Sequence, residues 1–525
     1  MRRAVLAAFV AVAGCGVVPD APAGLAAPRR ATLLFFSDAH AQLEEHPELF
    51  WTPDGRTEIA RAGGYARLAH VVNEIRRETR GRALLIDGGD TFQGSGPAAW
   101  SQGEVVLAPQ RALGVDLGLP GNWEVVYGPA RMRELAGAVD YPLIAANIVD
   151  EASGEPVFPA TLVREIGGIR FGFVGLTDPD VPVRQAPAYS RGLRYLDASS
   201  IEPHVRALRD EVDLVVLLAH VGLARTIAIA EQVDGIDIVL SGDTHERVYM
   251  PIRRGGTVIV EPGAFASFLG RLDVEFEPGK RPRFSWELIE LRADRFGEDP
   301  EVARVVREAL APWRDRSERV IGYTEVPLER YGVVENGVDE VLADAIRAET
   351  RAEIALSNGF RFGHPILPGP ILERDLWMLF PISTRLRVGT VTGRQLREFW
   401  ESEIDHVFAN DPRRLFGGWM PRVSGMTVRF RIDRPRGSRV TSIAVHGEPL
   451  DDDRIYSIAS CEREGDADDT LCRIRGVANV RTLELDVHEA VRRQLAARGT
   501  IRAVQGGRVV AEDLPSRVLS QYERR

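Results

Sequence analysis

The chain has 525 residues, which at roughly 100–200 residues per domain predicts two to four domains. Hydrophobic residues make up 44% and charged residues 27%, a balance that excludes a disordered, collagen-like or coiled-coil protein. The formal net charge of −10 gives no electrostatic reason to expect nucleic acid as a partner, and three cysteines are too few for a disulfide-rich scaffold or a Cys-based metal cluster.

The N-terminal residues 1–30 have the pattern of a secretory leader. A charged start is followed by an apolar run over residues 4–12 and then by small residues, which is typical of an export signal and too short for a permanent membrane span. The segment Val12–Cys15 resembles a bacterial lipobox, in which Cys15 would carry the lipid, and ordinary cleavage near Ala27 is the alternative. We therefore expect a periplasmic or otherwise exported protein that contacts a membrane through an N-terminal lipid at most.

Residues 31–293 alternate short apolar runs with amphipathic segments. Several runs are apolar along most of their length, as strands covered on both faces are, and helices are expected at Tyr65–Thr79 and Ile201–Arg209. This βαβ rhythm predicts a layered α/β domain. The expected strands are Thr32–Phe36, Ala83–Ile86, Tyr141–Ala145, Ile169–Gly175, Asp213–Leu218, Ile236–Leu240 and Thr257–Glu261.

A linker helix and a second domain follow. Residues 294–325 are polar and charged with apolar side chains at helical spacing, which predicts the linker helix. Residues 326–525 mix helices and strands, which predicts an α+β domain. Its expected helices are Val338–Ile354, Gly393–Val407 and Val487–Ala497, and its expected strands are Arg387–Val391, Met426–Ile432 and Ile455–Ala459.

Five short polar segments carry the chemistry of residues 31–293. Most of them follow an apolar strand directly, where side chains from several strands meet at the carboxyl edge of a sheet. Any one of them alone is explained by a helix cap or a turn, but the ordered set supplies carboxylate, imidazole and amide donors and no thiolate. Such a set suits two divalent ions of the Mn, Fe or Zn kind with one shared carboxylate. The segments are Asp38-Ala39-His40, Gly89–Gln93, Gly121–Glu124, Ala219-His220 and Gly242–His245.

The ordered set resembles the calcineurin-like metallophosphoesterases, within the 5′-nucleotidase superfamily. The resemblance implies a four-layer α/β/β/α dimetal domain followed by a C-terminal α+β substrate domain. It also implies a nucleophilic water or hydroxide between the metals, and it places Asp90 and Asn122 in the catalytic machinery. By the same resemblance the first metal is held by Asp38, His40, Asp90 and His245, and the second by Asp90, Asn122, His220 and Asp243, with Asp90 bridging.

Two positions depart from the phosphatase pattern. The family usually has Gly-Asn-His-Glu followed two residues later by Asp, a dyad that serves the leaving group, whereas this chain has Trp123 and Val126. An alkoxide of high pKa leaves poorly without that help, but a thiolate or persulfide leaves more readily, which favours sulfur–sulfur hydrolysis. The other departure is Asp243, where His is common. A carboxylate still ligates and shifts the site toward harder ions, so Mn is the expected metal, with Zn or Fe as alternatives.

The SoxB-type thiosulfohydrolases of bacterial sulfur oxidation are a closer resemblance. It rests on residues 38–43 (Asp-Ala-His-Ala-Gln-Leu), on Trp123, on residues 359–363 (Gly-Phe-Arg-Phe-Gly) and on the block over residues 408–426. It implies that the chain releases sulfate from an S-sulfonate on the C-terminal cysteine of a sulfur-carrier protein. Arg361 would then bind the sulfonate as a fork-shaped donor and Trp123 would line the substrate site; an interdomain ion pair and a packing aromatic are the alternatives.

Two other functions stay open, and the sequence also predicts a disulfide. The chain is alternatively a periplasmic 5′-nucleotidase or related phosphoesterase without its usual acid, or a metal-bearing binding protein with vestigial activity. Cys461 and Cys472 are the mature pair that remains if Cys15 is lipidated or removed. In an oxidising compartment we expect that pair to form a disulfide.

Overall fold

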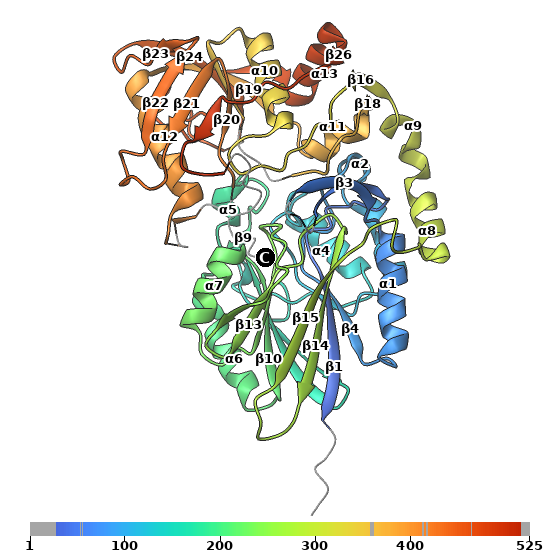
Figure 1. The fold of residues 1–525 in the computed structure, drawn as a ribbon. Helices are drawn as coiled ribbons and strands as arrows, with labels where there is room; N and C mark the ends of the chain where they lie inside the picture. Colours follow the sequence, from blue (N-terminus) through green and yellow to red (C-terminus); the bar gives the residue numbers. More distant parts are fainter. Residues whose placement is uncertain are drawn as a thin grey trace, which may run out of the picture.

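Two β-sheets packed face to face form the centre of the N-terminal domain (Figure 1). The computed structural model describes residues 28–52, 54, 56–357, 362–411, 414–415, 418–463 and 465–515. Both sheets are mixed. Antiparallel strands lie on one side of the first sheet given below and at both edges of the second, and the remaining strands pair in parallel. One sheet has the order β15 (Arg283–Glu290), β14 (Phe268–Phe276), β1 (Arg29–Phe36), β4 (Ala83–Asp87), β5 (Leu117–Gly118). The other has the order β12 (Ile252–Arg254), β13 (Thr257–Val260), β11 (Ile238–Ser241), β10 (Leu214–His220), β8 (Ile169–Thr177), β7 (Thr161–Ile166).

Strand β1 is apolar because both of its faces are buried. Leu33 and Phe35 lie between the sheets, in one core with Phe173 of β8. Leu34 and Phe36, on the opposite face of the pleat, belong to the core under the helices. A strand that is covered on both sides needs apolar residues at successive positions, which is the pattern that the sequence shows here.

Helices cover the outer face of each sheet. The core of the first sheet extends to helices α1 (Tyr65–Glu78), α3 (Glu104–Leu113) and α8 (Pro300–Leu310). The core on the far side of the second sheet includes α6 (Glu202–Arg209) and α7 (Leu223–Gln232). The order is therefore α/β/β/α, which confirms the predicted four-layer arrangement. Further helices of this domain are α2 (Gly96–Ser101), α4 (Pro129–Ala138) and α5 (Val181–Arg184).

The C-terminal domain combines sheets and helices in an α+β arrangement, as predicted. Its largest sheet has the order β20 (Arg422–Ser424), β17 (Ile354–Ser357), β24 (Ile455–Cys461), β19 (Arg385–Thr392), β25 (Ala478–Asp486). Smaller sheets join β18 (Gly369–Leu372), β16 (Val320–Thr324) and β26 (Thr500–Ile501), and β23 (Glu448–Pro449), β22 (Val440–Val445), β21 (Met426–Phe430) and β27 (Val509–Ala511). The longer helices are α10 (Gly337–Thr350), α12 (Gly393–Phe408) and α13 (Val487–Arg498), with α11 (Glu373–Leu379) shorter.

One expected strand is wrong. The segment Tyr141–Ala145 holds only an isolated bridge, between Leu143 and Gly118. Pro142 lacks the N–H that a strand interior needs, so the segment runs beside β5 without joining its sheet as a regular strand.

Two boundaries in the second half also differ from the prediction. The helix expected at Val338–Ile354 ends at Thr350, because Arg351 adopts a left-handed conformation (φ 57°) and Ile354 already begins β17. The expected linker over residues 294–325 is a succession of elements: α8, the short helix α9 (Arg314–Ser317), and β16, which pairs with β18.

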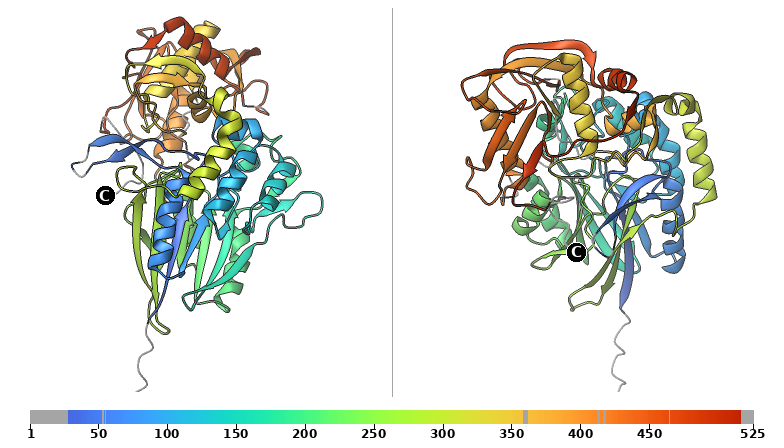
Figure 2. Two further views of the ribbon diagram at one scale, coloured as in Figure 1. Left: turned by 90° about the vertical axis from the view of Figure 1, so that its right-hand side faces the viewer. Right: turned by 45° about the horizontal axis from the view of Figure 1, so that its top comes forward.

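The C-terminal domain lies over the end of the sheets at which β1 and β4 finish (Figure 2). Gln93, which follows β4, donates a hydrogen bond of 2.7 Å to the carbonyl of Pro381. Phe362 places its ring 4.3 Å from that of His40, which follows β1. The functional segments of the N-terminal domain therefore face the second domain. Within the described part of the chain, we find no helix with the length and apolar character needed to cross a membrane.

Candidate metal centre and active site

The predicted metal-binding side chains gather at the carboxyl edges of the two sheets. Each follows or ends a strand, so the convergence of parallel strands brings them to one place. Asp38 and His40 follow β1, Asp90 follows β4, Asn122 follows β5, His220 ends β10 and His245 follows β11. Among the described residues, two groups of side chains have the geometry to hold a metal ion, and Asp38 belongs to both.

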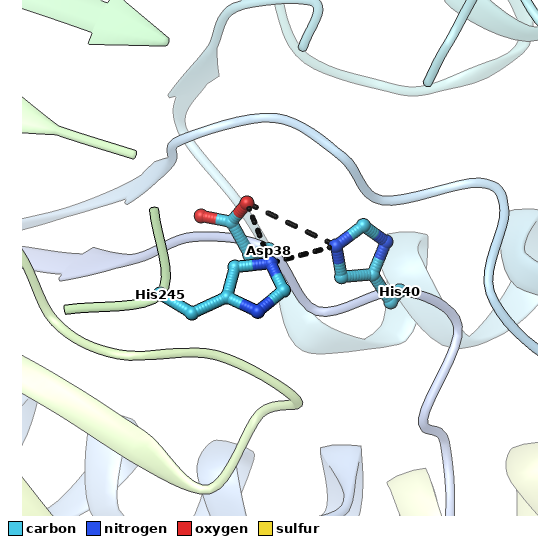
Figure 3. A group of neighbouring side chains, drawn as sticks. All are labelled: Asp38, His40 and His245. Carbon is cyan, nitrogen blue, oxygen red and sulfur yellow. Dashed lines mark hydrogen bonds and ion pairs between the residues drawn. The ribbon is translucent and has the colours of Figure 1, made fainter. Parts of the chain in front are cut away.

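The first group consists of Asp38, His40 and His245 (Figure 3). The Nε2 atoms of His40 and His245 lie 3.1 Å apart, and Nε2 of His245 lies 3.3 Å from Oδ1 of Asp38. Nδ1 of His40 lies 3.0 Å from the carbonyl oxygen of Gln93, which can only accept, so Nδ1 donates and Nε2 keeps its lone pair. Ligating histidines are commonly oriented in this way.

The second group consists of Asp38, Asp90 and His220. Nε2 of His220 lies 3.2 Å from Oδ2 of Asp90 and 3.7 Å from Oδ1 of Asp38. Nδ1 of His220 lies 2.7 Å from the carbonyl oxygen of Gly88, so this ring too presents an unprotonated Nε2 to the carboxylates when it is neutral.

Asn122 lies beside the carboxylate of Asp90. With its amide group oriented for hydrogen bonding, its Nδ2 donates to the two Asp90 oxygens at 3.2 and 2.8 Å. The donor set is oxygen and nitrogen without sulfur, which suits divalent Mn, Zn or Fe. The residues therefore fit two divalent ions.

Ionisation favours the ligating forms of Asp38 and His40. Burial raises the pKa of the Asp38 carboxyl, but the neighbouring His220 and His245 outweigh it and hold the pKa below its ordinary value. Burial, with His245 nearby, lowers the pKa of His40 to about 3. At neutral pH Asp38 is thus a carboxylate and His40 a neutral imidazole, which are the forms that bind a cation. At His220, burial lowers the pKa, but Asp90 and Asp38 raise it well above its ordinary value.

The backbone at the site is held in an unfavourable conformation. Positive φ angles, which non-glycine residues rarely adopt, occur at Asp38 (54°), His40 (48°), Asp90 (57°), Asp243 (82°) and His245 (57°). Each such residue costs on the order of 1–3 kcal/mol and persists only where surrounding structure enforces it. Their coincidence with the metal-binding segments marks this edge of the sheets as functional.

Glu124 organises the loops that carry Asp90 and Asn122. Its Oε2 accepts the backbone N–H groups of Asp90 (3.0 Å) and Gly121 (2.6 Å), and its Oε1 accepts that of Thr91 (2.6 Å). Burial and the neighbouring Asp90 raise the pKa of Glu124 to about 7. Glu124 was part of a predicted segment, but its role as an internal anchor was not predicted.

Trp123 lies at the edge of the metal centre, as its place in the sequence predicted. Its backbone N–H donates to Oδ1 of Asp90 at 2.8 Å, and its ring centroid lies 6.3 Å from that of His40. Phe362 of the other domain lies 5.7 Å from the Trp123 ring, and Phe265 lies 5.9 Å from Phe362. An aromatic wall therefore borders the site at the position where the phosphatase pattern has a proton donor.

Asp243, predicted as a metal ligand, is bound in this structure by a cation of the protein itself. Both of its carboxylate oxygens accept hydrogen bonds from the guanidinium of Arg184, at 3.0 and 3.1 Å, and Asp243 belongs to neither metal-binding group. Sequence reasoning missed Arg184, but a signal for this network was available. Asp178, the other partner of Arg184, directly follows β8, just as the predicted ligands follow their strands.

The remaining predicted residues are two that fall outside the described part of the chain and two cysteines. Cys15 and Arg361 are outside the residues that the structure describes. Cys461 and Cys472 are free thiols in the C-terminal domain, which corrects the expected disulfide. Burial raises the pKa of Cys461 to about 12 and that of Cys472 above its ordinary value, so both stay protonated and unreactive in this state.

Comparisons with known proteins agree with this architecture. Residues 31–247 match the family described as calcineurin-like phosphoesterase, and residues 320–462 match the 5′-nucleotidase C-terminal domain. Among solved structures, the chain is similar to the sulfate thiohydrolase SoxB of Thermus thermophilus, with 26% identity, a TM-score of 0.81, and coverage of 93% of this chain and 98% of that one. It also shares the fold of a 5′-nucleotidase precursor, likewise from Thermus thermophilus, with 22% identity, a TM-score of 0.79, and coverage of 93% and 100%.

The chain spans only about a third of the length of the first two curated relatives that it matches. The trifunctional nucleotide phosphoesterase YfkN of Bacillus subtilis is 26% identical over 431 residues, which cover 72% of this chain and 29% of YfkN. The chain likewise spans 36% of the endonuclease YhcR. A 5′-nucleotidase of Diplobatis ommata is 24% identical over 496 residues, which cover 83% of this chain and 82% of that protein.

A chain in which these two families follow one another, with buried metal-binding groups at the edge of paired sheets, is a metal-dependent hydrolase. It consists of an N-terminal calcineurin-like phosphoesterase domain and a C-terminal 5′-nucleotidase domain, and it belongs to the 5′-nucleotidase/metallophosphoesterase superfamily.

Proposed function

We propose that this hydrolase releases sulfate from an S-sulfonate on the C-terminal cysteine of a sulfur-carrier protein. The proposal is supported by the sequence blocks shared with the SoxB-type thiosulfohydrolases. It is also supported by the similarity over 93% of the chain to a sulfate thiohydrolase.

The observation that carries the proposal is the surroundings of Trp123. In the phosphatase pattern this position and that of Val126 hold a His–Asp dyad. Here an indole ring lies near Phe362 and His40, and Val126 is buried. Neither side chain gives up a proton at neutral pH, so the favoured substrate has a leaving group that departs as an anion. A thiolate or persulfide fits that requirement better than an alkoxide.

The metal-binding groups would supply the activation of water and of the sulfonate. Bound Mn ions would lower the pKa of a water molecule and polarise the sulfonate oxygens. Asp38, His40 and His245 would hold one ion, and Asp38, Asp90, Asn122 and His220 the other. Glu124 keeps the Asp90 and Asn122 loops in place through backbone hydrogen bonds. The aromatic wall at Trp123 excludes water from the leaving group.

Arg361 completes the proposed substrate site. It immediately precedes Phe362, whose ring contacts His40 at 4.3 Å. Its guanidinium would bind two sulfonate oxygens with paired donors. An Arg361→Gln variant is expected to raise KM for the sulfonated carrier, and Arg361→Lys is expected to restore little because an ammonium lacks the fork geometry.

A 5′-nucleotidase or related phosphoesterase is the second candidate. The match of residues 320–462 to a 5′-nucleotidase C-terminal domain and the Diplobatis ommata 5′-nucleotidase favour it. In that case the aromatic wall would contact a nucleoside instead of a carrier peptide.

Both candidates are tested on the same Mn-loaded preparation. Sulfate released from a carrier sulfonated on its terminal cysteine is measured by ion chromatography, and phosphate released from 5′-AMP is measured in parallel. We expect sulfate release with little phosphate release. Rapid cleavage of 5′-AMP without sulfate would refute the proposal, and an Asp90→Asn variant serves as the inactive control for both reactions.

Export and lipidation belong to the same proposal, because such a carrier substrate would be met outside the cytoplasm. Expression of the full chain and of a Cys15→Ser variant, followed by fractionation, tests this. We expect the parent chain in the membrane fraction and the variant in the soluble periplasmic fraction.

A further inference from the structure

The carboxylate of Asp243 is held by a cation of the protein itself. Nη1 of Arg184 donates to its Oδ2 at 3.0 Å and Nη2 donates to its Oδ1 at 3.1 Å, which is a paired, two-hydrogen-bond contact. The side chains are largely buried, with 13% of Arg184 and 4% of Asp243 exposed. Water therefore competes little with this ion pair.

Arg184 is itself fixed by a second carboxylate. Its Nη1 donates to Oδ2 of Asp178 at 2.5 Å, and Arg225 donates to the other oxygen of Asp178 at 3.1 Å. Asp178 is fully buried, so this contact positions the guanidinium before any ligand arrives. Arg184 has little freedom to leave Asp243.

Asp243 nevertheless lies beside the second metal-binding group. Its backbone N–H is 3.1 and 3.2 Å from the oxygens of Asp38, and its charge acts on the buried His220. Gly222 leaves the space for the carboxylate, because a Cβ there would lie 3.1 Å from Oδ2 of Asp243. Gln185, next to Arg184, donates at 2.6 Å to the backbone carbonyl of Asn122. The ion pair is thus connected to the residues of that group.

We infer that the Arg184–Asp243 ion pair stands in place of a metal ligand and makes the two metal positions unequal. The position at Asp38, His40 and His245 binds the first ion tightly. At the position of Asp38, Asp90, Asn122 and His220, the Asp243 carboxylate is bound by the Arg184 guanidinium, which neutralises its charge. Asp243 is therefore less available to a second ion. Arg184 is therefore a positioning residue that acts on the metal through Asp243. The inference rests on the metal centre of the proposed hydrolase and does not depend on which substrate it cleaves.

Metal titration of the full-length protein tests the inference. The chelator-stripped chain is titrated with Mn²⁺ by calorimetry, and bound Mn²⁺ is counted by electron paramagnetic resonance. We expect one tight step and a second step that is roughly 10- to 100-fold weaker, the range typical of a changed outer partner of a ligand. Two equal steps in the unaltered protein would overturn the inference.

Variants separate the ion pair from general effects of charge. Arg184→Gln combined with Asp243→His replaces the ion pair with a neutral ligand and is expected to bring the two affinities within about threefold. Arg184→Lys keeps the cation, so the steps should remain unequal. Arg225→Gln is the matched control, because it removes a guanidinium from Asp178 without touching Asp243. An equal gain in Arg225→Gln and in the double variant would show that the gain does not come from the Arg184–Asp243 ion pair and would refute the inference.

Loss of folding is distinguished from loss of metal by circular dichroism and thermal unfolding of each stripped variant. Failure of this inference can also be distinguished from failure of the proposed function. Equal metal affinities with normal sulfate release would reject only the ion-pair inference, whereas unequal affinities without sulfate release would reject only the proposed substrate.

Discussion

The rings of Trp123 and Phe362, one from each domain, lie 5.7 Å apart beside the metal centre. Neither residue is charged, and together they form the part of the site nearest the position where the phosphatase pattern has its proton donor. The selectivity of the reaction is therefore expected to depend on an apolar contact between domains as much as on the metal ligands.

Restoring the dyad is expected to change the preferred leaving group. The double variant Trp123→His, Val126→Asp supplies a general acid, and we expect kcat/KM for 5′-AMP to rise by roughly 100-fold. Sulfate release should fall, because the aromatic wall is opened. A Trp123→Phe variant keeps that wall and should show no gain with 5′-AMP. A double variant with unchanged phosphatase kinetics would mean that Trp123 does not set the selectivity.

Loss of Asp38 is expected to empty both metal positions, since this carboxylate belongs to both groups. Elemental analysis of Asp38→Asn should find less than one ion per chain, with hydrolysis at least roughly 1000-fold slower, the order expected when a metal's contribution is lost. A chelator should lower the Tm of the parent protein and leave that of Asp38→Asn unchanged, because only the parent has bound metal to lose. The matched control is Asp294→Asn, an exposed carboxylate that pairs with Arg292. Retention of two ions by Asp38→Asn would contradict the assignment.

A buried carboxyl in the C-terminal domain is expected to make stability depend on pH. Burial raises the pKa of Asp375 from 3.8 to about 6, while its carboxylate accepts the N–H of Leu372 at 2.8 Å. Because the folded-state pKa is the higher one, the protonated carboxyl favours folding below about pH 4. That contribution is lost as the pH rises through about 6.

Asp375→Asn keeps an acceptor for Leu372 but cannot ionise. The free energy of unfolding of both metal-free proteins is measured with urea between about pH 4 and 7. As the pH rises, the value for the variant should increase relative to that of the parent by on the order of 2–3 kcal/mol. Parallel stability curves over this interval would show that Asp375 does not titrate in the window.

The two thiols of the C-terminal domain are expected to resist alkylation. Because burial raises the pKa of Cys461 to about 12 from 9.0, its thiolate fraction at pH 8 falls by about a thousandfold. Mass spectrometry should find both cysteines slow to react with iodoacetamide in the native protein and fast after denaturation without reductant. Cysteines that remain unlabelled after denaturation would indicate a disulfide.

The sequence predicted those site residues whose position depends only on the direction of the strands they follow. Asp38, Asp90 and His220 each come at the end of an apolar run, and parallel pairing brings such ends to one edge without any knowledge of side-chain packing. The four-layer arrangement followed from the same runs, since strands such as β1 are apolar on both faces. The wrongly predicted strand contains Pro142, which interrupts regular pairing.

The contacts of Asp243 could not be predicted in the same way. Its partner Arg184 is 59 residues away, on a short helix whose direction depends on packing. A carboxylate at a ligand position looks the same in the sequence whether a metal or a guanidinium faces it. The contact between His40 and Phe362 depends in turn on how the two domains meet, which no local pattern records.

The contact between Phe362 and His40 has a thermodynamic consequence. A ring of the C-terminal domain rests at 4.3 Å against a side chain that we assign to the metal. A ligand that enters between the domains and displaces Phe362 changes the freedom of the His40 imidazole, and hence the affinity of the ion. By reciprocity the ion must change the affinity of that ligand by the same factor. Metal loading and binding of such a ligand are then coupled equilibria, so the affinity of this hydrolase for the ligand is a function of the free metal concentration around it.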